Sequence, residues 1–185
     1  MKKVISAVLT AAMVVGMGVS VLAATPSKTV ADEVKASGSA TVTGVLGIVS
    51  DVKVTAKDDT TQAEEVLDDI TSDAELQKTA GASEDKKVDI TVTQSFEMQT
   101  SNLLDAANVE LTIESKVIKA AYEDNEEVTV LVAVPTTKAD GTVTYTYHTV
   151  TGKVVNGEIV VNLKGRQVKL YGSNFVLVAV KTIEV

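Results

Sequence analysis

The chain has 185 residues, a formal net charge of −8 and no cysteine. A chain without cysteine has no disulfide, no thiol nucleophile and no cysteine-based zinc site. An acidic chain without a basic stripe binds nucleic acid poorly, so we expect no nucleic-acid partner.

The first 23 residues have the pattern of a secretory signal peptide. Two lysines at the start precede an almost wholly apolar run from Val4 to Leu22, and the small residues Ala23 and Ala24 follow. A basic start, an apolar centre and a small-residue cleavage site are the three parts of such a leader. We therefore expect a secreted, extracellular protein, associated with the cell surface or free in the medium. The alternative is an uncleaved anchor, because the run approaches the ~20 residues that span a bilayer. After cleavage we expect no membrane span.

The front of the mature chain predicts two strands and a helical segment. Residues 24–39 are small and polar and are typical of a flexible lead-in. Strands are expected at 40–46 and, from apolar alternation, at 51–56. Residues 61–79 carry apolar side chains at helical spacing, as one helix or as two short helices broken near Thr71.

Residue types also mark the ends of this helical segment. Thr61 and Glu64 have the spacing of a capping box, as do Ser72 and Glu75, and Gly81 is a typical stop. Acidic residues surround the first turns, and we interpret them as a solvated face rather than a cation site. They are Asp58, Asp59, Glu64, Glu65, Asp68 and Asp69.

From residue 88 onward the pattern is that of strands. Alternating or continuous apolar runs predict strands at 88–93, 109–114, 128–134, 143–147 and 175–180. Asp140-Gly141 marks a turn. Asn156-Gly157, between Val154-Val155 and Ile159-Val160, is expected to form a two-residue hairpin, because both central residues of a type I′ turn need positive φ.

Short strands at this rhythm predict a mainly β fold. We expect an antiparallel sandwich, Ig-like or related, with one or two short helices in the N-terminal half; a barrel has the same local signals. The expected organisation is a signal peptide at 1–23, a flexible lead-in at 24–39, a strand-helix subdomain or insertion at 40–87, and a β-sandwich domain at 88–185.

The sequence indicates no catalytic, cofactor-binding or metal-binding residue, and we expect no cofactor. His148 is the single histidine, and it has no cysteine or second histidine with which to share zinc. The Gly-x-Ser-x-Gly order of a nucleophile elbow does not occur, and Ser173 is typical of a turn. If a hydrolytic activity did depend on His148, Ser173 and Asp140 would be the first partners to mutate.

Two further groups have a structural and a functional interpretation. Tyr145 and Tyr147 share one strand face and suit stacking on a partner, but core packing explains them equally well. Asp124-Asn125-Glu126-Glu127 is an oxygen-rich turn without the residue order of a calcium-binding EF-hand, and a plain loop between strands has the same composition.

The last half of the chain carries a series of patterns in a recognisable order. The segment TQSFEM ends a strand near Phe96, VTVLV follows at 128–132, GEIVV at 157–161, and a turn with an apolar strand at 172–180. In this order, residues 88–180 resemble a β-sandwich module of secreted and cell-surface proteins of Gram-positive bacteria. The chain departs from the module at Ser173-Asn174, where Ser-Pro is common. The resemblance implies a structural or interaction role and carries over no catalytic residue.

The leading hypothesis is therefore a secreted, non-enzymatic protein with a binding, adhesion or structural role, whose partner is a protein or a cell-wall component. One alternative is a small secreted hydrolase that uses carboxylates, which needs a deep cleft with converging acids. The other is a self-assembling surface subunit that pairs through sheet edges, for which the signal is a long uncharged edge strand.

Overall fold

The structure is a computed structural model, and it describes residues 35–41, 51–70, 73–83 and 86–184. These residues form eight strands and four helices. The elements are β1 (Lys35–Thr41), β2 (Asp51–Ala56), α1 (Thr61–Asp69), α2 (Asp73–Ala80), β3 (Lys86–Ser101), β4 (Asn108–Glu114), α3 (Lys116–Ala121), β5 (Glu127–Thr137), β6 (Val143–Val155), β7 (Glu158–Lys164), α4 (Gly165–Tyr171) and β8 (Asn174–Glu184).

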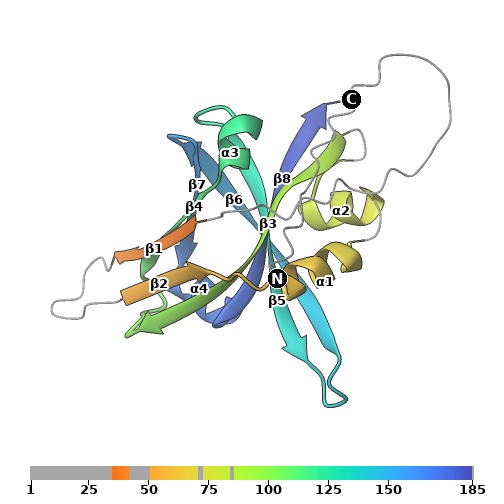
Figure 1. The fold of residues 1–185 in the computed structure, drawn as a ribbon. Coiled ribbons are helices and arrows are strands. Elements are labelled where there is room, and N and C mark those ends of the chain that lie inside the picture. The colour runs from red at the N-terminus through yellow and green to blue at the C-terminus, as the bar shows by residue number, and fades with distance from the viewer. Residues whose placement is uncertain (1–34, 42–50, 71–72, 84–85, 185) are drawn as a thin grey trace, which may run out of the picture.

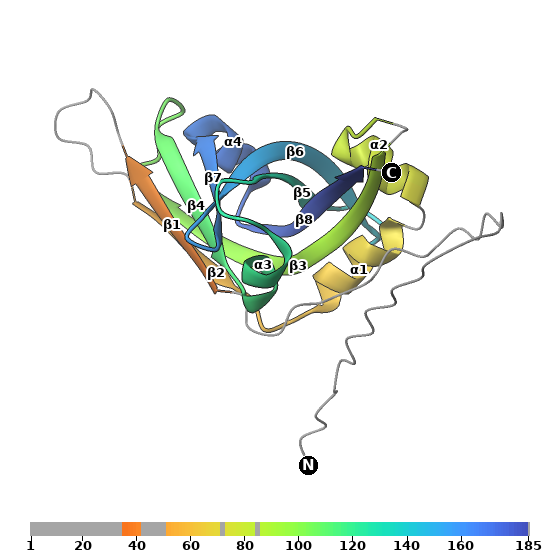
Figure 2. The ribbon, with the colours of Figure 1, turned by 90° about the horizontal axis from the view of Figure 1, so that it is seen from above.

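All eight strands belong to one antiparallel sheet, in the order β1-β4-β7-β6-β5-β8-β3-β2. The sheet curls until its two outermost strands, β1 and β2, lie side by side, so the molecule is nearly barrel-shaped (Figure 1, Figure 2). The prediction of a mainly β, antiparallel fold with few short helices is confirmed. The two facing sheets of an Ig-like sandwich are not confirmed, because the strands of the described residues pair continuously.

The long strand β3 shows how one sheet can bend so strongly. Its register against β8 shifts between Ile90 and Val92, which leaves Thr91 as an extra residue. Such a bulge increases the local twist and reverses which side chains face inward. Val88 and Ile90 accordingly pack outside the barrel, whereas Val92 and Phe96 pack inside it.

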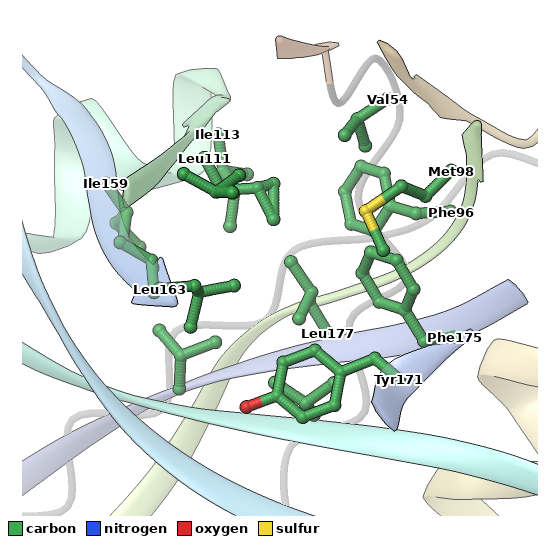
Figure 3. Close-up of a cluster of buried hydrophobic side chains, with 14 of the residues drawn as sticks. Val54, Phe96, Met98, Leu111, Ile113, Ile159, Leu163, Tyr171, Phe175 and Leu177 are labelled. Atoms are coloured by element: carbon green, nitrogen blue, oxygen red, sulfur yellow. The ribbon is translucent and has the colours of Figure 1, made fainter. Parts of the chain in front are cut away.

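Large apolar side chains fill the inside of the barrel. Figure 3 shows side chains from β3, β4, β7, α4 and β8 pointing toward one another. Phe175 lies at the centre of an aromatic group, with its ring centroid 5.8 Å from Phe96 and 6.4 Å from Tyr171. The barrel interior is thus the main hydrophobic core of the molecule.

A second apolar layer lies outside the barrel, where α1 and α2 cover β3, β5 and β8. Because β5 and β8 are buried on both faces, their sequences are continuous apolar runs rather than alternating ones. Two short helices in this region were one of the two expected forms, and that form is confirmed. Ser72 and its expected capping role lie outside the described residues.

The start of α1 differs in detail from the expected capping box. Asp59 Oδ1 accepts hydrogen bonds from Thr61 N at 3.0 Å and from Thr61 Oγ1 at 2.7 Å, while Thr60 Oγ1 donates to Glu64. Thr61 is therefore the capped residue and not the cap. At the other end Gly81, with φ +68°, follows the last residue of α2 as expected.

Two helices in the C-terminal half were not predicted, so the expectation that helices are confined to the N-terminal half is wrong. α3 begins after Ser115, whose Oγ accepts from Val117 N at 3.1 Å. α4 begins at Gly165, where a Cβ would lie 1.9 Å from the Leu104 carbonyl oxygen. They follow opposite ends of the β4–β7 pair, and Ile118 and Tyr171 extend from them into the core.

The predicted strands are found with adjusted bounds. The first lies at Lys35–Thr41 and pairs with β4, so its residues overlap the expected lead-in, and residues 42–50 lie outside the described part. The Asn156-Gly157 hairpin is confirmed: both residues have positive φ, 55° and 77°, and Val155 pairs with Glu158.

Candidate functional site

The hairpin of β5 and β6 extends past the rest of the sheet. β5 pairs with β6 along its whole length, Glu127–Thr137, but with β8 only from Thr129 to Ala133. On its other side β6 pairs with β7 only from Gly152 to Val155. The hairpin therefore projects beyond the barrel (Figure 1). Within the described ranges, no strand pairs with the far side of β6 between Val143 and Thr151.

The hydrogen-bonding pattern shows which backbone groups of β6 face this free edge. Val154 exchanges backbone hydrogen bonds with the segment before β5, since its N donates to Glu126 O and its O accepts from Asn125 N. Lys138 N donates to Thr142 O at the hairpin tip. Backbone direction alternates along a strand, so the even-numbered residues of β6 face β5 and the odd-numbered ones face the free edge. The latter are Val143, Tyr145, Tyr147, Thr149 and Thr151.

The free edge of β6, defined here as Val143–Thr151, is unusual in composition. It contains no acidic residue, no lysine, no arginine and no proline. Soluble monomers usually protect exposed edges with such residues, since an open ladder invites another strand. Val143 is 37% exposed, and Thr146, Thr149 and Thr151 are also exposed. This edge is the candidate functional site.

The outer face of the same strand is fastened to the two covering helices. The Tyr145 hydroxyl donates to Glu65 Oε2 at 2.6 Å, and the Tyr147 hydroxyl donates to Asp69 Oδ2 at 2.8 Å. Thr149 Oγ1 donates to the Thr79 carbonyl at 2.9 Å. Three successive outward side chains of β6 therefore bind α1 and α2, which holds the hairpin in place.

These contacts change the acid-base behaviour of the two tyrosines. Burial and the hydrogen-bonded Glu65 carboxylate raise the pKa of Tyr145 above its ordinary value. Burial and the Asp69 carboxylate raise the pKa of Tyr147 in the same direction. In both cases a phenolate would lie beside a carboxylate in a partly desolvated place, so the neutral phenol is favoured. The tyrosines thus act as hydrogen-bond donors to α1.

The acidic residues near α1 all lie exposed, consistent with the expected solvated face. Two of them, Glu65 and Asp69, additionally accept the tyrosine hydrogen bonds. An open hollow lies between α1, α2 and Tyr147, and Asp69, Glu75 and Lys78 line it. This hollow is a surface depression beside the free edge.

The three residues considered for hydrolysis lie in different settings. His148 packs its ring against Tyr171, with centroids 5.4 Å apart. Asp140 lies in the hairpin tip, where its Oδ1 accepts from Thr142 N at 2.9 Å. Ser173 lies after α4, and its Oγ accepts from Asn174 Nδ2 at 3.2 Å. Each of these side chains has a local structural contact, and the contact of His148 is aromatic.

The oxygen-rich segment before β5 also has structural contacts. Asp124 Oδ1 accepts from Asn156 N at 2.6 Å, and Glu126 Oε2 accepts from Glu123 N at 2.8 Å. Lys181 lies 3.5 Å from Glu126 Oε1. The carboxylates fasten this loop to the β6–β7 turn and to β8. Within the part of the chain that the structure describes, no three potential metal-ligating side chains lie together.

No helix among the described residues is both long and apolar enough to cross a membrane. Comparison with models of protein families, with curated proteins and with solved structures finds no match for this chain.

Sequence reasoning identified Tyr145 and Tyr147 as a pair on one face but missed the free edge beside them. A signal was present: no acidic or basic residue occurs between Asp140 and Lys153 apart from His148. β7 pairs with β6 only from Gly152 to Val155, and this leaves residues 143–151 without a neighbouring strand. Where β7 stops pairing depends on the fold and has no local signal in the sequence.

Proposed function

We propose that this protein is exported and acts outside the cytoplasm as a non-enzymatic binding or structural protein, with the free edge of β6 as its contact surface. The partner is a protein strand that adds to this edge. The leader at 1–23 supports export.

The single observation that carries the proposal is the open ladder of β6. Strand addition to a sheet edge gains affinity from main-chain hydrogen bonds and specificity from the alternating side chains. The hairpin offers both, because five residues direct their backbone groups outward and an uncharged set of side chains flanks them. Its attachment to α1 and α2 keeps the edge extended before binding, which lowers the entropic cost of association.

We assign the rest of the barrel a structural role, which is to hold the free edge of β6 in place. Its interior is packed with apolar side chains, and the ring of His148 packs on Tyr171. The resemblance of residues 88–180 to modules of Gram-positive surface proteins agrees with a structural or adhesive role at the cell surface.

Site-specific photo-crosslinking of the exported full chain tests this proposal. A photoreactive residue at Thr149 lies on the free edge, and the same residue at the exposed Arg166 of α4 is the matched control. We expect protein adducts in the producing cells from position 149 and far fewer from position 166. Equal labelling at both positions, or none at 149, contradicts the proposal.

A further inference from the structure

We infer that the strand that fits this edge is the β6 of a second copy of the chain, paired antiparallel about a two-fold axis at Tyr147. This inference rests on the proposed function, because it names the partner of the same edge. The symmetry of the edge, its side chains and its lack of charged residues support a second copy as the partner.

The geometry of the edge is compatible with two-fold symmetry. In an antiparallel pair, the residues that exchange both hydrogen bonds are those whose backbone groups face the other strand. On β6 these are the odd-numbered residues, and Tyr147 is the middle one of the five. A two-fold axis at Tyr147 places Tyr145 opposite the partner's Thr149, and Val143 opposite the partner's Thr151. Every outward backbone group of the free edge is then paired.

The length of the edge fits this register as well. The ladder begins at Val143, the first residue of β6, and ends at Thr151, just before β7 takes over the pairing at Gly152. A register shifted by two residues toward the hairpin tip places Thr151 opposite Gly141, which lies outside β6, and so leaves one outward residue of each strand unpaired. A shift the other way runs into β7.

The side chains that meet in this register are mutually favourable. Pairs of aromatic and β-branched residues directly opposite each other stabilise antiparallel strands. The register pairs tyrosine with tyrosine at the axis, tyrosine with threonine beside it, and valine with threonine at the ends. A chain with a formal charge of −8 repels its own copies over most of its surface. Between Val143 and Thr151 the strand itself has no acidic residue that would add to this repulsion.

Charged side chains of α1 and α2 lie close to the expected axis, since Asp69, Glu75 and Lys78 line the hollow beside Tyr147. Asp69 accepts the Tyr147 hydrogen bond, so a two-fold axis at Tyr147 brings the Asp69 carboxylates of both copies near each other. Their repulsion weakens the pairing and gives it a recognisable signature. Asp69→Asn keeps an oxygen acceptor for Tyr147 and removes the charge, so we expect it to lower the dissociation constant of the dimer.

The register is tested by disulfide formation, because the chain has no native cysteine. In the double variant Val143→Cys/Thr151→Cys, the two new cysteines of one chain are about 26 Å apart along the strand and cannot bond to each other. In the inferred dimer each lies opposite the other cysteine of the partner, at a Cα distance of about 5.5 Å, within disulfide range. We expect a covalent dimer on mild oxidation.

The matched control moves one cysteine by two residues. Val143→Cys/Lys153→Cys keeps the first position and uses another exposed site, which the inferred register leaves about 7 Å out of step. We expect little covalent dimer from this variant. Equal yields from both variants, or the higher yield from the control, contradict the register.

Sedimentation of the full exported chain tests the association itself. Wild-type protein is expected to form a dimer as its concentration rises. Thr146→Lys places a charge on the free edge and is expected to abolish the dimer. Thr137→Lys, at an exposed position of β5 in the same hairpin, is expected to leave it unchanged. Circular dichroism of each variant shows whether the fold is retained.

The outcomes separate this inference from the proposed function. A wild-type chain that stays monomeric at every concentration overturns the self-pairing. If photo-crosslinking from Thr149 then captures a different protein, the free edge is still a contact surface and only the identity of the partner is wrong. If the chain is monomeric and position 149 gives no adduct, both are wrong.

Discussion

The Tyr145 hydroxyl donates a hydrogen bond to Glu65 Oε2 at 2.6 Å, and this contact joins β6 to α1 across the outer face of the sheet. Tyr145→Phe removes the donor and keeps the ring. We expect it to lower the free energy of unfolding by roughly 0.5–1.5 kcal/mol, below the usual value for a bond to a carboxylate, because this contact is exposed to solvent. Urea denaturation measures the change. Glu65→Gln keeps an acceptor and should cost less; a Tyr145→Phe variant as stable as wild type contradicts the assigned contact.

The four tyrosines predict how stability changes at high pH. Burial, above all, raises the pKa of Tyr122 to about 12, and burial also raises the pKa of Tyr145, Tyr147 and Tyr171. The folded protein therefore holds these protons more tightly than the unfolded chain, in which tyrosine has a pKa of about 10. Their contribution to stability is complete below pH ~10 and is lost as the pH rises above it.

Tyrosinate absorbance and circular dichroism recorded together test this expectation, and the absence of tryptophan keeps the absorbance simple. We expect most of the phenolate to form only well above pH ~10, at the same pH at which the circular dichroism signal of the β-sheet is lost. Titration of most tyrosines near pH 10 with the sheet intact is the contrary result.

Two threonines on β3 predict opposite effects of the same substitution. Thr93 is fully buried, and its Oγ1 has no hydrogen-bond partner among the described residues. Thr93→Val removes an unpaired hydroxyl at nearly constant shape, so it should raise the free energy of unfolding by about 1 kcal/mol. Thr91 Oγ1 contacts the Tyr122 hydroxyl at 2.7 Å and donates to the Ala179 carbonyl at 3.0 Å. Thr91→Val should therefore lower it by about 1 kcal/mol or more.

Chemical denaturation of the two variants under the same conditions gives this comparison directly. A loss of stability in Thr93→Val as large as that in Thr91→Val would show that the Thr93 hydroxyl is satisfied in solution.

The β6–β7 turn predicts a backbone effect at Gly157. Its φ is +77°, and a Cβ there would lie 2.7 Å from Lys119 Cγ. Gly157→Val should destabilise the protein by roughly 1–3 kcal/mol, because β-branched residues resist positive φ. Gly157→Asn tolerates this conformation better and is the control. Thermal melting ranks the three proteins, and a valine variant that melts with wild type is incompatible with the turn.

Local signals in the sequence were sufficient for most of the elements. The alternation of residues 51–56, the apolar run of β5 and the Asn-Gly turn each predict their own conformation, because the causes lie within a few residues. The two unpredicted helices have six and seven residues and no periodicity to detect. A glycine is needed at the start of α4 because a Cβ at Gly165 would lie 1.9 Å from the Leu104 carbonyl oxygen, and only the folded chain brings these two residues together.

Local sequence signals do not predict the arrangement of the strands in the sheet or the position of the candidate site. Whether eight strands form two sheets or one depends on which edges meet, and the bulge at Thr91 has no marker in the sequence. The uncharged run of β6 is visible in the sequence. Its exposure is not, because it follows from the short pairing of β6 with β7.

Amide hydrogen exchange along β6 tests the central claim most directly, because the two sets of amides alternate within one strand. In a dilute sample, the amides of Tyr145, Tyr147 and Thr149 face the free edge and should exchange fast. Those of Thr146, His148 and Val150 face β5 and should be protected. As the concentration rises, we predict that the first set becomes protected while the second set does not change. If the amides of the first set stay unprotected at every concentration while those of the second set are protected, the edge is never covered, and the self-pairing is contradicted.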